Sequence, residues 1–310
     1  MTIAILGPGG VGGFIGAALA RAGVPTTIVA RDSTARLIAA DGISIESVRL
    51  GAFVVHPEAV AQLRAPVEVL IVATKAAGLA VALERIEAEP ELVVPLLNGL
   101  DHMSLLRSRF GLGRVAAGAI RIEADRPGPG RVVQTSPFLR VDLASDQPPL
   151  SPAVSRLADT LRGAEIPVQV GSSEAQILWS KLVRLNALAC TTSACDRPIG
   201  FIRSDPQWRA ALVGCIEEAA AVADADGAQI DPAARLAELD DAHPELGSSM
   251  QRDIAAGREP ELDAIPGAVL RAAARHGIEC PTITRLTLEI QGRIANSCGL
   301  SRRKLGESSG

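Results

Sequence analysis

Aromatic residues are scarce in this chain of 310 residues, which has no tyrosine, two tryptophans and five phenylalanines. Its cores must therefore be filled by aliphatic side chains, and stacking platforms for single-stranded nucleic acid are largely missing. The formal net charge is −4, whereas a nucleic-acid-binding surface is normally basic. We therefore expect no nucleic-acid partner and a small molecule as the ligand.

The cysteines do not suggest a metal site. Their number is odd, no two of them form a C-x-x-C motif, and the chain has only four histidines. Zinc sites usually combine closely spaced pairs of cysteine and histidine. We therefore expect no metal, and reduced, mostly buried thiols at Cys190, Cys195, Cys215, Cys280 and Cys298.

Long hydrophobic runs are missing as well. A membrane-spanning helix needs about 20 consecutive apolar residues, and no such stretch occurs. The first predicted strand begins at residue 2, which leaves no room for a secretory signal peptide. We expect a cytoplasmic protein without a membrane partner.

What the chain does have is a glycine-rich turn between a strand and a helix. An apolar strand at 2–6 is followed by Gly7-Pro8-Gly9-Gly10-Val11-Gly12 and then by an apolar helical run. In this G-x-G-x-x-G pattern the first glycine makes a tight turn, the second lets the backbone approach a pyrophosphate, and the third allows close helix packing. The helix N-terminus then faces the phosphates. We therefore expect residues 7–12 to bind a dinucleotide.

The end of the second predicted strand, at 26–30, indicates which dinucleotide. NAD sites usually carry an acidic residue about 20 residues after the glycines, where it holds the ribose hydroxyls. This chain has Arg31, whose charge suits a 2′-phosphate, so the sequence favours NADP(H). In the alternative, Arg31 is a solvated surface residue and Asp32 binds the ribose.

Two further strands deliver polar residues to the same sheet edge. The apolar runs at 67–73 and 92–97 are typical of parallel strands covered on both faces, and they end in Lys75 and Asn98. Open α/β sheets bind ligands at the carboxyl ends of their strands, so both residues are site candidates. In the alternative, Lys75 is a solvated lysine at a helix start and Asn98 is a turn residue before glycine.

The remaining elements follow from hydrophobic periodicity. We expect helices at 33–40, 79–86 and 151–161, a strand pair within 43–55, antiparallel strands appended to the sheet within 115–143, and a last strand at 168–170. Further helices are expected at 174–189, 206–226, 232–239, after 249, at 263–276 and at 281–294, before a frayed end at 301–310. The fold class is therefore α/β, with a Rossmann-type doubly wound domain at 1–170 and an all-helical domain at 171–310. The cleft between two such domains is the usual place for a second substrate.

One lysine in the helical half has apolar neighbours on both sides. Lys181 follows the apolar segment 177–179 and precedes Leu182 and Val183. Partial desolvation destabilises an ammonium group and makes it a better proton donor. Most lysines on amphipathic helices, however, simply extend to water.

Several segments together form a more specific pattern. They are Gly7 to Gly12, Arg31, Thr74-Lys75, Asn98-Gly99, Trp179-x-Lys181-Leu182, Arg197-Pro198-Ile199-Gly200, Ser248-Ser249-Met250-x-x-Asp253-x-x-x-Gly257-Arg258-x-x-Glu261-Leu262-Asp263 and Arg275-His276-Gly277-Ile278-x-Cys280-Pro281-x-x-x-Arg285-Leu286. Over essentially the whole chain, this pattern resembles the ketopantoate reductase family, also called 2-dehydropantoate 2-reductases. The segment at 248–263 is the most specific part.

The resemblance implies reduction of 2-dehydropantoate to pantoate by hydride transfer from NADPH, a step of pantothenate biosynthesis. Lys181 matches the family's catalytic lysine, which protonates the carbonyl oxygen, and Glu261 matches an acid that hydrogen-bonds the substrate near that lysine. Ser249 matches a serine that helps to hold the substrate carboxylate. Asn98 matches an asparagine near the nicotinamide and the substrate.

Arg31 and Lys75 match the family's pair of cations at the adenosine 2′-phosphate end of NADPH. From the residues alone, two of the substrate candidates also have plain structural roles. Ser249 could be a helix N-cap, and Glu261 could be an exposed acid at a helix start.

One departure concerns the substrate pocket. Many family members carry asparagines four and eight residues after the catalytic lysine, where this chain has Leu185 and Ala189. Asn186 is one residue out of register, about 100° around the helix, and remains the polar candidate for substrate binding. We therefore expect a less polar pocket.

Two other functions stay open. One is a reductase of the same fold that acts on a more apolar keto acid or imine. The other is a sensor that binds NADPH without turnover. The helical half has enough apolar surface for a homodimer, but the sequence does not show which face would be buried.

Overall fold

The computed structural model describes the backbone of residues 1–306 and the side chains of residues 1–296. It divides into two compact units, Met1–Leu178 and Trp179–Gly310. Each unit is described by itself below.

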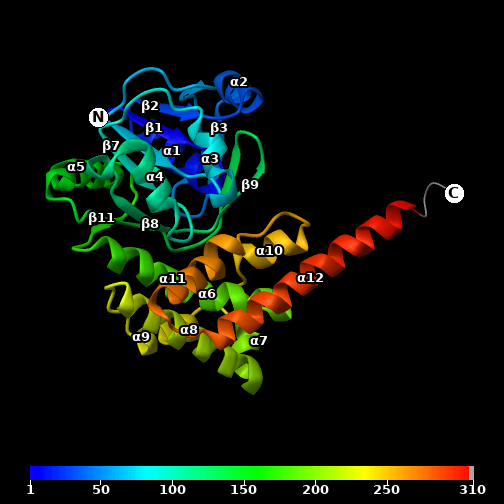
Figure 1. The fold of residues 1–310 in the computed structure, drawn as a ribbon. Coiled ribbons are helices and arrows are strands. Elements are labelled where there is room, and N and C mark those ends of the chain that lie inside the picture. Colours follow the sequence, from blue (N-terminus) through cyan, green and yellow to red (C-terminus); the bar gives the residue numbers. More distant parts are fainter. Residues whose placement is uncertain (307–310) are drawn as a thin grey trace. The chain divides into compact units, whose positions relative to one another are not determined.

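The first unit is built on a parallel sheet of five strands (Figure 1). Its strands are β1 (Ile3–Leu6), β2 (Thr26–Val29), β5 (Glu58–Val60), β6 (Val69–Val72) and β7 (Leu92–Pro95), in the spatial order β5-β2-β1-β6-β7. All neighbouring pairs are parallel. The chain moves outward from β1 in one direction and then in the other, so the strand order reverses between β1 and β6. This is the order of a Rossmann fold, whose ligands bind at that reversal point.

The central strands are apolar because both of their faces are covered. In β1, Ile3 and Ile5 belong to one buried cluster while Ala4 and Leu6 belong to another. Successive side chains of a strand point to opposite faces, so the two clusters are the two sides of the sheet. Helices of the first unit are α1 (Gly10–Arg21), α2 (Asp32–Asp41), α3 (Leu79–Leu83), α4 (His102–Phe110) and α5 (Ser151–Gly163).

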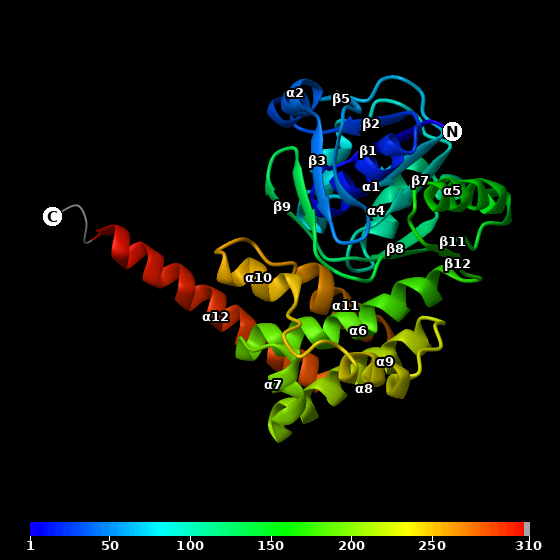
Figure 2. The same ribbon diagram turned by 180° about the vertical axis from the view of Figure 1, so that it is seen from behind.

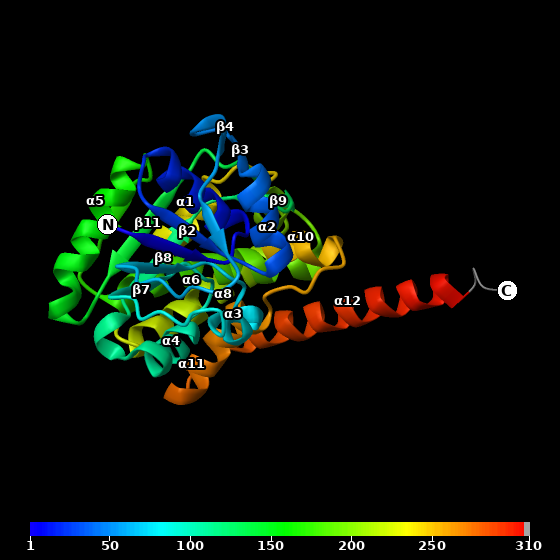
Figure 3. The same cartoon turned by 90° about the horizontal axis from the view of Figure 1, so that it is seen from above.

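Two smaller sheets complete the first unit. One has the order β4 (Gly51–Val55), β3 (Ile43–Ser47), β10 (Arg131–Gln134), β9 (Ala124–Gly128), and the other has the order β12 (Val168–Val170), β11 (Arg140–Ala144), β8 (Ala117–Arg121). Helix α5 lies along the second of them (Figure 3). The prediction that the strands within 115–143 are appended to the main sheet was therefore wrong, because they belong to these two separate sheets. Glycines of α1 let the β9–β10 hairpin pack over that helix, where β10 pairs with β3.

The described part of the second unit is helical and has no strand (Figure 2). Its helices are α6 (Glu174–Cys195), which begins in the first unit, and then α7 (Ile199–Ser204), α8 (Pro206–Ala225), α9 (Pro232–Asp240), α10 (Ser249–Ala255), α11 (Ala268–His276) and α12 (Pro281–Gly306). The predicted fold class, a Rossmann-type α/β region followed by a helical region, is confirmed.

Several predicted boundaries were wrong. The helix predicted at 79–86 ends at Leu83 and follows a 3₁₀ turn at Ala76–Gly78, and α6 continues to Cys195. The helix predicted at 263–276 opens with a π-helical turn, Asp263–Gly267, because Pro266 lacks the N–H that a regular helix would use there. Helix α12 runs past residue 294 to Gly306, so residues 301–306 are helical rather than frayed, and 307–310 lie outside the described residues.

The cysteine side chains of the described region are free thiols. Cys190, Cys215 and Cys280 are buried and Cys195 is partly exposed. Burial raises the pKa of the Cys280 thiol to about 11, so this group stays protonated at neutral pH. Residues 1–296 contain no cluster of three side chains suited to a metal ion, and no described helix has the length and apolarity to cross a membrane.

Replacing Gly12 by alanine tests the packing of α1. The added Cβ would lie 2.2 Å from the carbonyl oxygen of Gly7, and neither backbone can yield easily. We expect Gly12→Ala to lower the free energy of unfolding by about 2 kcal/mol, measured by denaturant unfolding. Gly163→Ala is the control, because nothing lies within 4 Å of the added Cβ. Equal stability of the two variants would contradict the close contact.

Candidate active site

The glycine turn follows β1 at the point where the strand order reverses. Gly7 has a φ of +92°, and a Cβ added there would lie 2.8 Å from Cγ2 of Thr74. A Cβ on Gly12 would meet the carbonyl oxygen of Gly7. Gly7 is required because its backbone is in the left-handed region. Gly12 is required because α1 begins in direct contact with the turn.

Gly9 and Gly10 differ in what surrounds them. A Cβ on Gly10 would lie 1.9 Å from the carbonyl oxygen of Ala124, where β9 covers the start of α1. A Cβ on Gly9 would meet only the carbonyl oxygen of Ala73, at 4.0 Å. Gly10 thus serves packing within the protein, whereas the missing side chain of Gly9 leaves open space in front of the turn.

The residues present fit the pyrophosphate of a dinucleotide. The N-cap of α1 is Gly9, which has no side chain that could accept a hydrogen bond from the helix. The first-turn N–H groups of Gly10, Val11 and Gly12 have no partner within a regular helix. The hydroxyl of Thr74 is buried and has no hydrogen-bond partner among the described residues. A helix N-terminus with open space before it attracts anions.

Three predicted residues lie along the same edge of the sheet. Arg31 is exposed at the N-cap of α2, just after β2, and its neighbour Asp32 is the first residue of α2. Lys75 is exposed and follows β6, and Asn98 is partly exposed and follows β7. Because the strand order is β2-β1-β6-β7, Arg31 and Lys75 flank the glycine turn on either side. The prediction that these strand ends share one edge is therefore confirmed, while their binding roles stay predictions.

Helix α6 carries Lys181, which is partly exposed between buried neighbours, Trp179 and Leu182. Leu185, one turn later on the same helix face, is also partly exposed. Ala189 is fully buried. Of the two positions at which the chain departs from the expected asparagines, only Leu185 thus reaches the surface of the second unit beside the lysine.

Asn186 lies inside the second unit and has no exposed surface. Its Oδ1 accepts a hydrogen bond from Sγ of Cys190 at 3.4 Å, and its Nδ2 has no partner among the described residues. Solvent does not reach this side chain, in contrast to the other residues predicted to bind substrate.

The N-cap of α10 is Ser248, not Ser249. Oγ of Ser248 accepts a hydrogen bond from the backbone N–H of Gln251 at 3.0 Å and lies 2.9 Å from Oγ1 of Thr192 on α6. Sequence reasoning missed this residue, although Ser-x-x-Gln is a capping-box pattern. The capping role weighed for Ser249 therefore belongs to its neighbour, and Ser249 is a partly exposed residue in the first turn.

Glu261 is partly exposed in the segment between α10 and the π-helical turn at 263–267. Its carbonyl oxygen accepts a hydrogen bond from the backbone N–H of Ile265 at 3.0 Å. The carboxylate therefore sits just before the π-helical turn rather than within a regular first turn of a helix.

A buried acid anchors the first residue of α6 in the first unit. Glu174 forms an ion pair with Arg107 of α4, and its backbone N–H donates to Oδ1 of Asp146 at 3.1 Å. Burial raises the pKa of the Glu174 carboxyl, and the hydrogen bond from Arg107 opposes that rise. The sequence offered no signal for this pair, because its members lie 67 positions apart.

Comparison with known proteins extends these observations. The family model described as ketopantoate reductase PanE/ApbA matches residues 3–144, and the model of its C-terminal part matches residues 175–293. A 2-dehydropantoate 2-reductase of Mycobacterium tuberculosis is 31% identical over 291 residues, covering 90% of this chain and 93% of that protein.

Solved structures agree in fold. A 2-dehydropantoate 2-reductase of Geobacter metallireducens superposes with a TM-score of 0.87 at 25% identity, covering 94% of this chain and 99% of that one. D-mandelate dehydrogenase in complex with NADH and anilino(oxo)acetate superposes with a TM-score of 0.86 at 20% identity, covering 96% and 99% of the two chains.

The fold and the glycine turn define a protein of the dinucleotide-binding class. The chain belongs to the ketopantoate reductase family, as the sequence motifs predicted, and it is accordingly an oxidoreductase that acts on CH–OH groups with a nicotinamide cofactor.

Proposed function

We propose that this protein reduces a 2-keto acid to the 2-hydroxy acid with NADPH, and that 2-dehydropantoate is the substrate. The observation that carries the proposal is the match of both parts of the chain to one reductase family. The open glycine turn and the cations beside it support the cofactor assignment. On this proposal the first unit binds the cofactor, and the second supplies the proton and most of the substrate contacts.

On this proposal, the cofactor is held by residues at the carboxyl ends of the strands of the main sheet. Residues 7–12 would hold the pyrophosphate through backbone N–H groups, and Arg31 with Lys75 would hold the 2′-phosphate. Arg31 makes no side-chain hydrogen bond or ion pair within residues 1–296, so it can bind an anion without breaking an internal contact. When bound, the reduced nicotinamide supplies the hydride.

The proton comes from the chain itself. The ammonium of Lys181 donates a proton to the carbonyl oxygen of the substrate, which becomes the hydroxyl of the product, and the neutral amine then takes a proton from water. Ser249 and Asn98 hold the substrate by hydrogen bonds, and Glu261 orients it near the lysine. Asn186 has no exposed surface, so a direct contact with the substrate is not part of this proposal. Fixed donors at the developing alkoxide lower the barrier more than donors that must reorient.

A second candidate is reduction of a bulkier, more apolar 2-keto acid. It is favoured by Leu185, which shares the exposed face of α6 with Lys181. The structural neighbour D-mandelate dehydrogenase is solved with anilino(oxo)acetate, an oxo acid that carries an aromatic ring. An apolar side chain near the lysine would favour such a substituent over the hydroxyl-bearing one of 2-dehydropantoate.

Substitution of Lys181 tests the chemistry. We expect Lys181→Ala to lower kcat by about 100-fold or more, because a positioned general acid contributes about 10²–10⁴ in rate. Lys181→Arg keeps the charge but cannot give up its proton at neutral pH, so it should lose turnover equally. Both variants should bind NADPH as the wild type does, measured by fluorescence titration. An active Lys181→Ala enzyme would refute the assignment.

Substitution of Arg31 tests the cofactor preference. Loss of a charge-assisted contact to a phosphate should raise the Kd of NADPH by at least about tenfold in Arg31→Ala, while the Kd of NADH changes little. Arg36→Ala, which removes another exposed arginine of α2, is the matched control. An equal loss of affinity for both cofactors would argue against a 2′-phosphate contact.

A panel of keto acids decides between the two substrates. With 2-dehydropantoate, benzoylformate and branched aliphatic 2-keto acids, kcat/KM measured by NADPH oxidation should be highest for 2-dehydropantoate on the main proposal. Leu185→Asn should then shift kcat/KM further toward 2-dehydropantoate by about tenfold, since one pocket side chain discriminates by about 1–3 kcal/mol. A preference for benzoylformate that Leu185→Asn reverses would establish the second candidate instead.

A further inference from the structure

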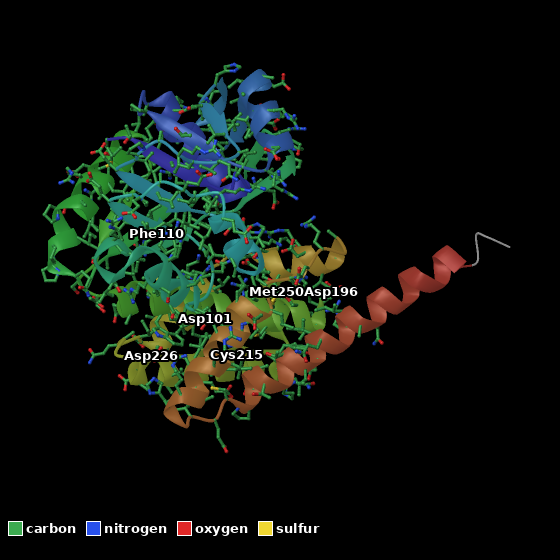
Figure 4. The ribbon with its side chains drawn as sticks, turned by 45° about the horizontal axis from the view of Figure 1, so that its top comes forward. Asp101, Phe110, Asp196, Cys215, Asp226 and Met250 are labelled. Atoms are coloured by element: carbon green, nitrogen blue, oxygen red, sulfur yellow. The ribbon has the colours of Figure 1, made fainter. Side chains whose placement is uncertain are left out.

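A buried tryptophan lies at the start of the second unit, two residues before Lys181. Trp179 is 1% exposed, and its indole Nε1 donates a hydrogen bond to Oδ2 of Asp226 at 3.1 Å. Asp226, labelled in Figure 4, directly follows α8 as its C-cap residue. The carboxylate therefore holds the first part of α6 within the second unit against the end of α8.

The same carboxylate also binds the end of a third helix. Nε2 of His276 lies 2.6 Å from its Oδ1, and Nη2 of Arg275 lies 3.4 Å from its Oδ2. Both residues belong to the last turn of α11. Asp226 thus connects α6, α8 and α11 through both of its oxygens.

The position of this carboxylate is unfavourable on its own. The C-terminus of a helix carries partial negative charge, so an acidic residue at the end of α8 is destabilised by the helix dipole. The side chain of Asp226 is also only 19% exposed, which removes much of its hydration. Its placement is therefore explained by what its contacts supply, namely the indole donor and the Arg275 charge at Oδ2 and the His276 ring nitrogen at Oδ1.

The contact constrains the direction of the lysine. Residues two apart on an α-helix are separated by about 200°, so Trp179 and Lys181 project from nearly opposite sides of α6. An indole held by a hydrogen bond and buried in the core prevents this turn of α6 from rotating about its axis or sliding along it. A fixed turn presents the lysine in one direction.

We propose that Asp226 is a positioning residue for Lys181 and that it acts through Trp179. This inference rests on the proposed function, in which Lys181 is the proton donor. On this proposal, the Trp179–Asp226 hydrogen bond contributes to kcat as well as to the stability of the fold.

Three variants remove or keep the contact. Trp179→Phe keeps an aromatic ring but loses the donor, Asp226→Ala loses the acceptor, and Asp226→Asn keeps an oxygen that can accept the indole N–H. Asp224→Ala is the matched control, because it removes an exposed carboxylate from the last turn of α8. All are made in the full chain and assayed well below their unfolding midpoints.

We expect Trp179→Phe and Asp226→Ala each to lower kcat by about tenfold, since displacement of a reacting group by about 1 Å can cost up to 10²-fold. The Kd of NADPH should stay unchanged, because the glycine turn is untouched. The double variant should be no slower than Asp226→Ala alone, since that substitution already removes the Trp179–Asp226 contact. Asp226→Asn should recover most of the activity, and Asp224→Ala should match the wild type.

The inference is overturned if Trp179→Phe and Asp226→Ala lower only the unfolding midpoint, or if their effects on kcat multiply in the double variant. A wild-type rate in Trp179→Phe beside an inactive Lys181→Ala would overturn this inference and leave the proposed function intact. A wild-type enzyme that reduces no keto acid of the panel would instead sink the proposed function and this inference with it.

Discussion

The backbone contact between the start of α1 and the glycine turn is the constraint on which the first unit depends. Because Gly12 has no side chain, α1 begins against the carbonyl oxygen of Gly7, and its first-turn N–H groups lie at the end of β1. Gly10 admits the backbone at Ala124 equally closely, which brings the β9–β10 hairpin over the same helix. The open edge at the glycine turn and the position of the second sheet thus follow from the same short segment.

Much of the fold was predictable because its signals are local. The parallel strands are apolar runs buried on both faces, and their order follows from the Rossmann pattern. The pairing of β10 with β3 was not predictable, since it joins segments about 90 residues apart. Each segment by itself has only the pattern of a short hairpin strand, which does not specify a distant partner. The π-helical turn at 263–267 depends on Pro266, and hydrophobic periodicity does not distinguish such a turn from a regular helix.

Some residues of the candidate site could likewise be predicted from the sequence, and others could not. Arg31, Lys75 and Asn98 could be placed from the sequence because each follows a buried strand. Lys181 carries a weaker local signal, although the chain has only three lysines. Asp226 carries no signal, because its contacts with Trp179 and His276 span 47 and 50 positions. Residues that act through such distant contacts become visible only once the helices are packed.

Helix α6 is held at Glu174 by the first unit and at Trp179 by the second, and the lysine follows two positions later. Each residue inserted into or deleted from this stretch would turn the lysine by about 100° and shift it by about 1.5 Å relative to one of the two anchors. In natural variants, the number of residues between Glu174 and Lys181 should therefore stay constant, and only substitutions should occur there. If Lys181 is the proton donor as proposed, substrate preference would then change by exchange of side chains one helical turn from the lysine, the position that Leu185 occupies.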